Sequence, residues 1–192
     1  MPVDRVLIDA NCLHKLYLRT LLLTLADAEL IEPRWSQAII TETIRSITRR
    51  FPERSSSVED RLNSLSKFFK NSLVLGYEYL VGGLGCLDQA DEHVLAAAIH
   101  SESDVLLTFN LSDFPKETFE KYGVKVMNPD RYLMILANKD KEAFLMATAA
   151  WMRHFKMPAL RAQEAVQAIQ RAGCGSLSVW LDSNANELNN LL

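Results

Sequence analysis

Arg5-Val6-Leu7-Ile8-Asp9 (RVLID) is a short apolar run that ends in an acid. A run of this kind predicts a buried strand. Asp9 is then the last residue of that strand. Strands that are buried on both faces are typical of parallel sheets packed between helices.

The segments that follow alternate between helical and extended patterns. Helix 37–50 is well defined, with Ser36 as its N-cap, an apolar stripe that begins at Ile40, and Pro52 at its end. This alternation predicts an α/β fold with a central, mainly parallel sheet covered on both faces. The predicted strands are 5–9, 30–35, 104–109 and 124–127, and the predicted helices are 11–28, 37–50, 58–70, 88–101 and a short one at 119–122.

Only helical patterns follow Pro129, at 142–155, 158–172 and 177–181. We therefore predict an α/β domain over residues 1–138 and an all-helical C-terminal extension over residues 139–192. The stretch Asn184–Asn190 is rich in asparagine and is expected to fray.

The composition describes a globular chain without a strong overall charge. Of 192 residues, 48% are hydrophobic, which is enough to bury a core, and the formal net charge is −3. A protein that binds duplex nucleic acid over its whole surface is usually clearly basic, so any contact with nucleic acid should be local. The three widely separated cysteines support neither a disulfide framework nor a zinc site. With no signal peptide and no apolar run long enough to span a membrane, we expect a reduced, cytoplasmic protein.

Acidic and amide side chains gather where the predicted strands end. Asp9 ends the first strand, and Asn110 and Asp113 directly follow the strand 104–109. In parallel α/β sheets, ligands bind at the carboxyl ends of the strands. Asp91 lies in the first turn of its predicted helix, on the side that faces inward, and should point toward the same edge of the sheet.

Glu42 is the remaining acid of this set. It lies off the apolar stripe of helix 37–50, on a side that it shares with Arg45 and Arg49. Taken singly, each acid has a plain structural explanation: Asp9 as a turn residue, Asp91 as an acid at a helix N-terminus, and Asp113 as a helix cap. Taken together, they favour a site, because clustered carboxylates repel one another and need a cation.

The cation that suits such a cluster is a hard divalent ion. Mg²⁺ and Mn²⁺ prefer oxygen ligands. The same ion activates water and stabilises charge on a phosphate during in-line displacement. The acids alone therefore indicate metal-dependent phosphodiester chemistry.

Several blocks of the sequence resemble those of PIN-domain proteins, and in particular VapC-type toxins, the ribonucleases of bacterial toxin–antitoxin pairs. The resemblance runs from about residue 4 to about residue 136, and one branch of that family carries a helical C-terminal extension similar to residues 139–182. The blocks are Val6–Asn11 (VLIDAN), the helix that carries Glu42, Asp91–Ala98 (DEHVLAAA) and Leu107–Pro115 (LTFNLSDFP).

The resemblance implies a PIN-like three-layer sandwich and Mg²⁺- or Mn²⁺-dependent cleavage of RNA, restrained by a cognate antitoxin; it also admits a homodimer. By matched position, Asp9, Glu42 and Asp91 are the metal-binding acids. Either Asn110 or Asp113 completes the site, with Asn110 as a neutral ligand or Asp113 as a fourth catalytic acid.

Other residues have supporting roles in this interpretation. Thr108 would bond Asp9 or a metal-bound water, and Asp88, one turn before Asp91, would add a ligand or cap its helix. The basic residues after Glu42, Arg45, Arg49 and Arg50, would hold RNA phosphates. The alternative for each of them is a solvated helix face with i,i+4 pairs.

Rival functions fit the residues less well. A haloacid-dehalogenase-like phosphatase needs a second aspartate two residues after Asp9, where this chain has Asn11. The layout of a phosphate-accepting response regulator does not fit either. The alternative that stays open is a PIN-like scaffold that binds RNA or protein without cutting.

Overall fold

The computed structural model describes residues 3–84, 91–114, 121–155 and 161–192. Asp88, and the part of helix 88–101 that precedes residue 91, lie outside these residues, as do residues 119 and 120 of the short helix predicted at 119–122.

The centre of the fold is a five-stranded sheet in which every pairing is parallel. Its order is β3-β2-β1-β4-β5, so the buried strand quoted above, β1, is the middle strand. The chain therefore adds strands on one side of β1 and then crosses to its other side. The point between β1 and β4, where that direction reverses, is where doubly wound sheets bind their ligands. The strands are β1 (Arg5–Ile8), β2 (Glu32–Ser36), β3 (Leu73–Val74), β4 (Val105–Leu107) and β5 (Lys125–Met127).

The chain forms two compact units. The sheet unit comprises Met1–His14 and Glu32–Met127, and the helical unit comprises Lys15–Ile31 and Asn128–Leu192. Compactness does not show which parts of the chain fold and act as domains. The predicted division into residues 1–138 and 139–192 therefore stays a prediction.

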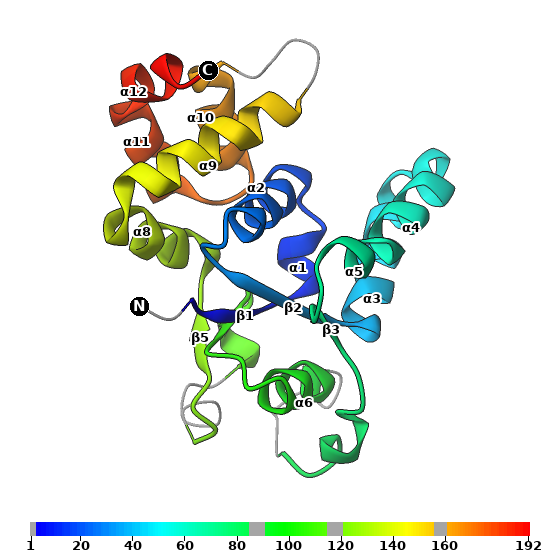
Figure 1. Cartoon of the computed structure of the whole chain (residues 1–192). Coiled ribbons are helices and arrows are strands. Elements are labelled where there is room, and N and C mark those ends of the chain that lie inside the picture. Colours follow the sequence, from blue (N-terminus) through cyan, green and yellow to red (C-terminus); the bar gives the residue numbers. More distant parts are fainter. Residues whose placement is uncertain (1–2, 85–90, 115–120, 156–160) are drawn as a thin grey trace. The chain divides into compact units, whose positions relative to one another are not determined.

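Helices of the sheet unit cover both faces of the sheet. Because parallel crossovers are right-handed, the helices that lead from β2 to β3 lie on the opposite face from α6 (Glu92–His100), which leads to β4. Figure 1 shows α6 on one side of the strands and α4 and α5 on the other. The remaining helices of this unit are α1 (Ala10–Leu13), α3 (Gln37–Arg50), η1 (Pro52–Arg54), α4 (Ser55–Asn63), α5 (Leu65–Phe68), η2 (Glu78–Leu80) and η4 (Leu111–Asp113).

Helix α3 forms as predicted, and its two faces differ in character. The Ser36 hydroxyl caps it by accepting the backbone N–H of Ile39 at 3.2 Å. Ile39, Ile40 and Thr43 are buried on the inner face. The opposite face, which carries Glu42, is therefore free to serve a site.

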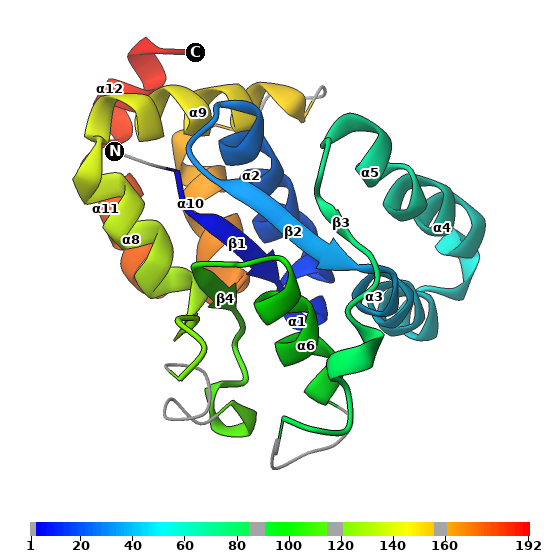
Figure 2. The same ribbon diagram turned by 60° about the horizontal axis from the view of Figure 1, so that its bottom comes forward.

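The helical unit packs around its own core. Phe144, Trp151, Leu181 and Leu188 are fully buried in it. Trp151 Nε1 donates to Thr20 Oγ1 at 2.9 Å, which satisfies the one polar atom of that ring. Figure 2 shows α2 beside α9 and α10. The helices of this unit are α2 (Leu16–Asp27), α8 (Pro129–Lys139), α9 (Lys141–His154), α10 (Ala162–Arg171), α11 (Gly175–Ser183) and α12 (Ala185–Asn190). No described helix is long and apolar enough to cross a membrane.

The structure corrects four details of the predicted elements. The helix at 11–28 is broken, because Lys15 is extended between α1 and α2; neither proline nor glycine marks the break. Residues 185–190, which were expected to fray, form helix α12, in which Leu188 is buried and Glu187 pairs with Lys141 at 2.7 Å.

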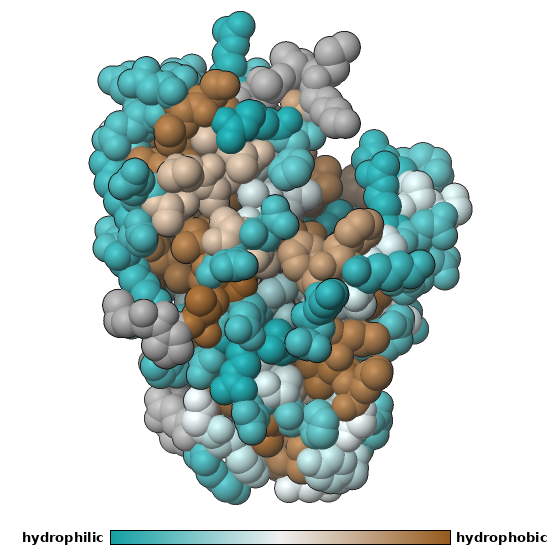
Figure 3. Space-filling view, in the orientation of Figure 1, coloured by the Kyte–Doolittle hydropathy of each residue, from teal (hydrophilic) through white to brown (hydrophobic). Residues whose placement is uncertain are grey.

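The other two corrections lie between β2 and α6. Strand β3 was not predicted, since two residues are too few for a periodic pattern. The helix at 58–70 starts earlier, at Ser55, and is interrupted at Ser64. Only Leu62 of α4 is buried; the surface over this helix, at the upper right of Figure 3, is mainly hydrophilic.

The Asp130 carboxylate of α8 caps a helix that is distant in sequence. Its two oxygens accept the backbone N–H groups of Ser176 at 2.9 Å and Leu177 at 2.8 Å, which lie in the first turn of α11. We predict that Asp130→Ala lowers Tm by about 3–6 °C, because a lost cap costs about 1–2 kcal/mol. Asp130→Asn keeps one acceptor and should lose about half as much. An unchanged Tm in both variants, measured by circular dichroism, would contradict this role.

Candidate active site

Asp9 lies directly after β1 as the N-cap of α1, and its side chain is buried, with 7% of the residue exposed. One carboxylate oxygen accepts the backbone N–H of Ala10 at 2.6 Å. The other accepts from Asn11 Nδ2 at 2.6 Å and from the Thr108 hydroxyl at 2.7 Å. The predicted bond between Thr108 and Asp9 is therefore present.

Thr108 and Asn11 connect the ends of β1 and β4. Thr108 is fully buried, and its hydroxyl oxygen accepts from Asn11 Nδ2 at 2.8 Å and from the backbone N–H of Asn110 at 3.0 Å. The Asn11 carbonyl oxygen accepts the backbone N–H of Phe109 at 3.1 Å. The sequence placed Asn11 in a block that resembles the family and argued with it against a phosphatase, but it predicted no hydrogen-bonding role for Asn11; the signal for that role was its place two residues after the strand-end acid.

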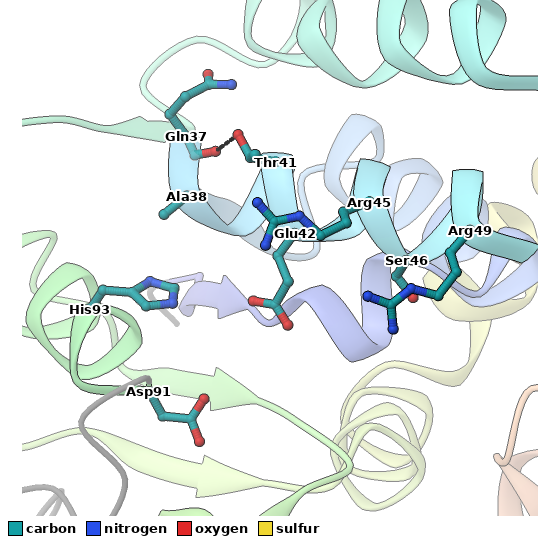
Figure 4. A pocket seen from close by; sticks show the side chains of 9 residues that line it. All are labelled: Gln37, Ala38, Thr41, Glu42, Arg45, Ser46, Arg49, Asp91 and His93. Carbon is teal, nitrogen blue, oxygen red and sulfur yellow. Dashed lines mark hydrogen bonds between the residues drawn. The ribbon is translucent and has the colours of Figure 1, made fainter. Parts of the chain in front are cut away.

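A cleft of about 860 Å³ opens beside this edge. One wall is the outer face of α3, and the other comes from residues at the start of α6 (Figure 4). Glu42 and Asp91 both line it, and so do Arg45 and Arg49, as their shared helix side predicted. The full lining is Gln37, Ala38, Thr41, Glu42, Arg45, Ser46, Arg49, Asp91 and His93.

Arg50 does not line the cleft. Its guanidinium lies over the Phe51 ring, with its central carbon 5.6 Å from the ring centroid, and the guanidinium of Arg54 lies 5.2 Å from the same centroid. Both contacts are of the cation–π type. Arg50 therefore stands apart from Arg45 and Arg49.

The carboxylates affect one another electrostatically. Burial raises the pKa of Asp9 to about 6; the hydrogen bonds from Thr108 and Ala10 oppose this rise, and the charges of Glu42 and Asp113 add to it. The pKa of Glu42 is also raised, first by partial burial in the cleft wall and then by the charge of Asp91, while Arg45 lowers it. Asp9, Glu42, Asp91 and Asp113 thus form one interacting group of acids.

Asn110 and Asp113 lie together in and beside the short helix η4. The Asn110 amide donates to the Asp113 carboxylate, and the Ser112 hydroxyl donates to the Asn110 carbonyl oxygen at 3.2 Å. Asn110 is exposed and does not line the cleft, whereas Asp113 is close enough to raise the pKa of Asp9.

The donor atoms suit a hard divalent cation, because the acids offer only oxygen and their mutual repulsion calls for positive charge. Within the described ranges, however, no three Asp, Glu, His or Cys side chains already surround one point closely enough to hold a metal ion. The acids are gathered but do not form a closed coordination shell.

Two residues at the start of α6 were not singled out in the sequence as candidates for the site. Glu92 is buried, and its carboxylate accepts the backbone N–H groups of Gly82 at 2.6 Å and Leu84 at 2.7 Å, which anchors that turn. His93 lines the cleft. Neither could be found by spacing, since the turn that Glu92 binds and the α3 wall that His93 faces belong to other elements.

The family comparison agrees with the fold. A family model described as a PIN domain matches residues 5–112, more than half of the chain. A Mycobacterium tuberculosis protein named "Putative ribonuclease VapC50" is 33% identical over 63 residues, which are 33% of this chain and 37% of that protein. The matching segment thus spans little more than a third of the length of that relative. No solved structure matches the chain.

The raised pKa of Asp9 predicts a pH-dependent stability. Protonation favours the folded state, so the contribution of Asp9 is complete below about pH 4 and is lost as the pH rises through about 6. The loss is about 3 kcal/mol. In metal-free buffer, we therefore expect Tm of Asp9→Asn minus Tm of the wild type to increase by roughly 5–10 °C from pH 4 to pH 7.5.

Comparing the two proteins at each pH removes any pH-independent cost of the asparagine. The exposed change Asp182→Asn is the matched control for the altered net charge. A difference between Asp9→Asn and wild type that stays constant with pH would show that burial does not raise the pKa of Asp9.

Proposed function

Since the chain belongs to the PIN-domain family, we propose that it is a metal-dependent endoribonuclease, with Mg²⁺ or Mn²⁺ held by Asp9, Glu42 and Asp91. The observation that carries the proposal is the electrostatic coupling of these acids at the point where the strand order reverses. A buried carboxylate whose pKa is raised to about 6, beside further acids, is a costly arrangement that a divalent cation relieves.

The bound ion would supply an activated water and neutralise charge on the scissile phosphate. The residues of the chain have distinct tasks around it. Thr108 and Asn11 hold Asp9 in one orientation through the hydrogen bonds described above. Asp113 is the fourth acid of the catalytic group, because its charge reaches Asp9. Asn110 orients Asp113 and is at most a neutral ligand.

Arg45 and Arg49 would bind the phosphates that flank the scissile bond. Both line the cleft on the α3 wall that also carries Glu42, and Arg guanidinium groups are suited to phosphate oxygens. Arg50 would act outside the cleft, from its place over Phe51. The supporting role predicted for Asp88 remains part of the proposal.

We further propose that the biological role of the chain is that of the toxin in a toxin–antitoxin pair. It is supported by the resemblance to VapC-type toxins and by the similarity to the relative whose name includes VapC50. The cognate antitoxin would bind the chain and restrain it, and the toxin would act on RNA in the cytoplasm; a homodimer remains compatible with this role. Residues 1–138 would form the nuclease domain, and the extension 139–192 would take part in protein contacts.

A second function is favoured by one observation. Among the residues that the structure describes, no three candidate ligands lie close enough together to hold a metal. A PIN-like scaffold that binds RNA or protein without cutting would have no need of such a group. A cleavage assay with divalent ions distinguishes the two functions.

We predict that cleavage of a fluorescent single-stranded RNA requires Mg²⁺ or Mn²⁺ and stops with EDTA. Asp9→Asn and Asp91→Asn should each lower kcat at least about a hundredfold, the scale of losing roughly 3 kcal/mol of electrostatic stabilisation. Asn110→Ala should cost less, because a neutral side chain contributes less to binding a cation. Full activity of both aspartate variants would refute the metal site, and RNA binding without any cleavage would favour the scaffold.

We also predict that Arg45→Ala and Arg49→Ala weaken RNA binding more than they slow cleavage. Each lost phosphate contact should reduce the slope of log Kd against log salt concentration by about one unit. Arg153→Ala, which removes an exposed arginine of the helical unit, is the control for net charge. If the slope is the same in all three variants and the wild type, Arg45 and Arg49 belong to a solvated helix face.

A further inference from the structure

The two ends of the cleft differ in charge. Along α3 its wall runs from Gln37 in the first turn to Arg49 in the last, a length of roughly 18 Å. Figure 4 shows Arg49 toward one end, the Arg45 guanidinium beside Glu42 in the middle, and Gln37, Ala38 and His93 toward the other end. Beyond Arg45, the α3 wall of the second end carries the uncharged residues Gln37, Ala38 and Thr41, of which Ala38 has only a methyl group.

His93 has an unusual environment at this uncharged end. Its Nδ1 atom is buried and has no hydrogen-bond partner in the part of the chain that the structure describes. Buried polar atoms are nearly always paired, because an unpaired one loses its bonds to water without replacement. Packing alone therefore gives no reason for histidine at this position.

The unpaired Nδ1 determines which nitrogen of His93 is the donor. If the single proton of the neutral ring were on Nδ1, a buried N–H would have no acceptor. The proton is instead favoured on Nε2, at the far side of the ring, and the ring reaches into the cleft from α6 (Figure 4). The charged ring also carries a proton on Nε2. In either protonation state, His93 presents an N–H donor to the cleft.

The position of this donor indicates what it binds. A phosphate next to the scissile bond is better served by Arg45, beside Glu42, and by Arg49 at the other end. The uncharged end suits a neutral group that offers a hydrogen-bond acceptor, and the small side chain of Ala38 leaves room for a ring. In a single-stranded RNA, the neutral group next to the scissile phosphate is a nucleoside.

We propose that the end of the cleft formed by Gln37, Ala38, Thr41 and His93 is a nucleoside subsite, in which His93 Nε2 donates a hydrogen bond to the nucleoside next to the scissile phosphate. This inference rests on the proposed function, since it assigns part of the same cleft to the substrate. It makes His93 a binding residue and gives it no part in the chemical step.

The test is RNA binding by fluorescence anisotropy in EDTA, with a fluorescein-labelled single-stranded RNA and the full chain. His93→Leu should raise Kd about fivefold, the scale of one lost hydrogen bond. His93→Gln, whose amide can place an N–H near the position of Nε2, should stay within about twofold of the wild type. His100→Leu, on the same helix but outside the cleft, is the control and should not change Kd.

A second measurement separates binding from a structural role. His93→Leu removes the unpaired buried nitrogen, so Tm should rise by about 3 °C while RNA affinity falls. A purely structural histidine would lower both when replaced. With Mg²⁺ or Mn²⁺ present, KM should rise about fivefold and kcat should stay within about twofold.

Isothermal titration of Mn²⁺ without RNA tests the competing explanation, that His93 orients Glu42 or Asp91. A weaker Mn²⁺ affinity of His93→Leu with unchanged RNA affinity in EDTA would overturn the subsite. So would a wild type that does not bind the RNA in EDTA. A wild type that binds RNA but never cleaves it, together with the predicted loss in His93→Leu, would refute the nuclease and retain the subsite.

Discussion

The hydrogen bonds that connect the end of β1 to the end of β4 are the constraint on which the site depends. Thr108 and Asn11 both donate to one oxygen of Asp9, and Asn11 also accepts the backbone N–H of Phe109. These hydrogen bonds lie between β1 and β4, where the strand order reverses. At such a point no crossover helix fills the space at the carboxyl edge of the sheet. An acid at this position is buried and is held in one orientation by these bonds.

The same constraint gives the site its electrostatic character. Asp9 keeps three hydrogen bonds, yet burial outweighs them and its pKa rises. The charges of Glu42 and Asp113 raise the pKa of Asp9 further, and the charge of Asp91, from the facing wall of the cleft, raises the pKa of Glu42. The charged acids therefore lower the free energy of unfolding at neutral pH. A bound cation would raise it again, because a cation binds the charged carboxylates of the folded state.

Neighbouring residues at the start of α6 have different tasks: one stabilises a turn, and two line the cleft. Glu92 turns inward and binds the backbone of the turn at Gly82 and Leu84. Its neighbours Asp91 and His93 face the cleft. Asp91 precedes the helix as its N-cap, whereas Glu92 and His93 are adjacent helical residues that point about 100° apart. The start of α6 can therefore anchor a turn and also supply side chains to the cleft.

The sequence by itself determined the parts of this protein that depend on local patterns. The apolar run 5–8 and the alternation of elements predicted a parallel sheet, and the 3.6-residue period of α3 placed Glu42 on the same side as Arg45 and Arg49. Only the tertiary structure decided the role of Asn11, whose partners Thr108 and Phe109 are 97 and 98 residues away. It also decided the unpaired environment of His93 and the burial of Leu188. The physical reason is that a period depends on neighbours within one element, whereas burial and hydrogen bonding depend on atoms that other elements bring together.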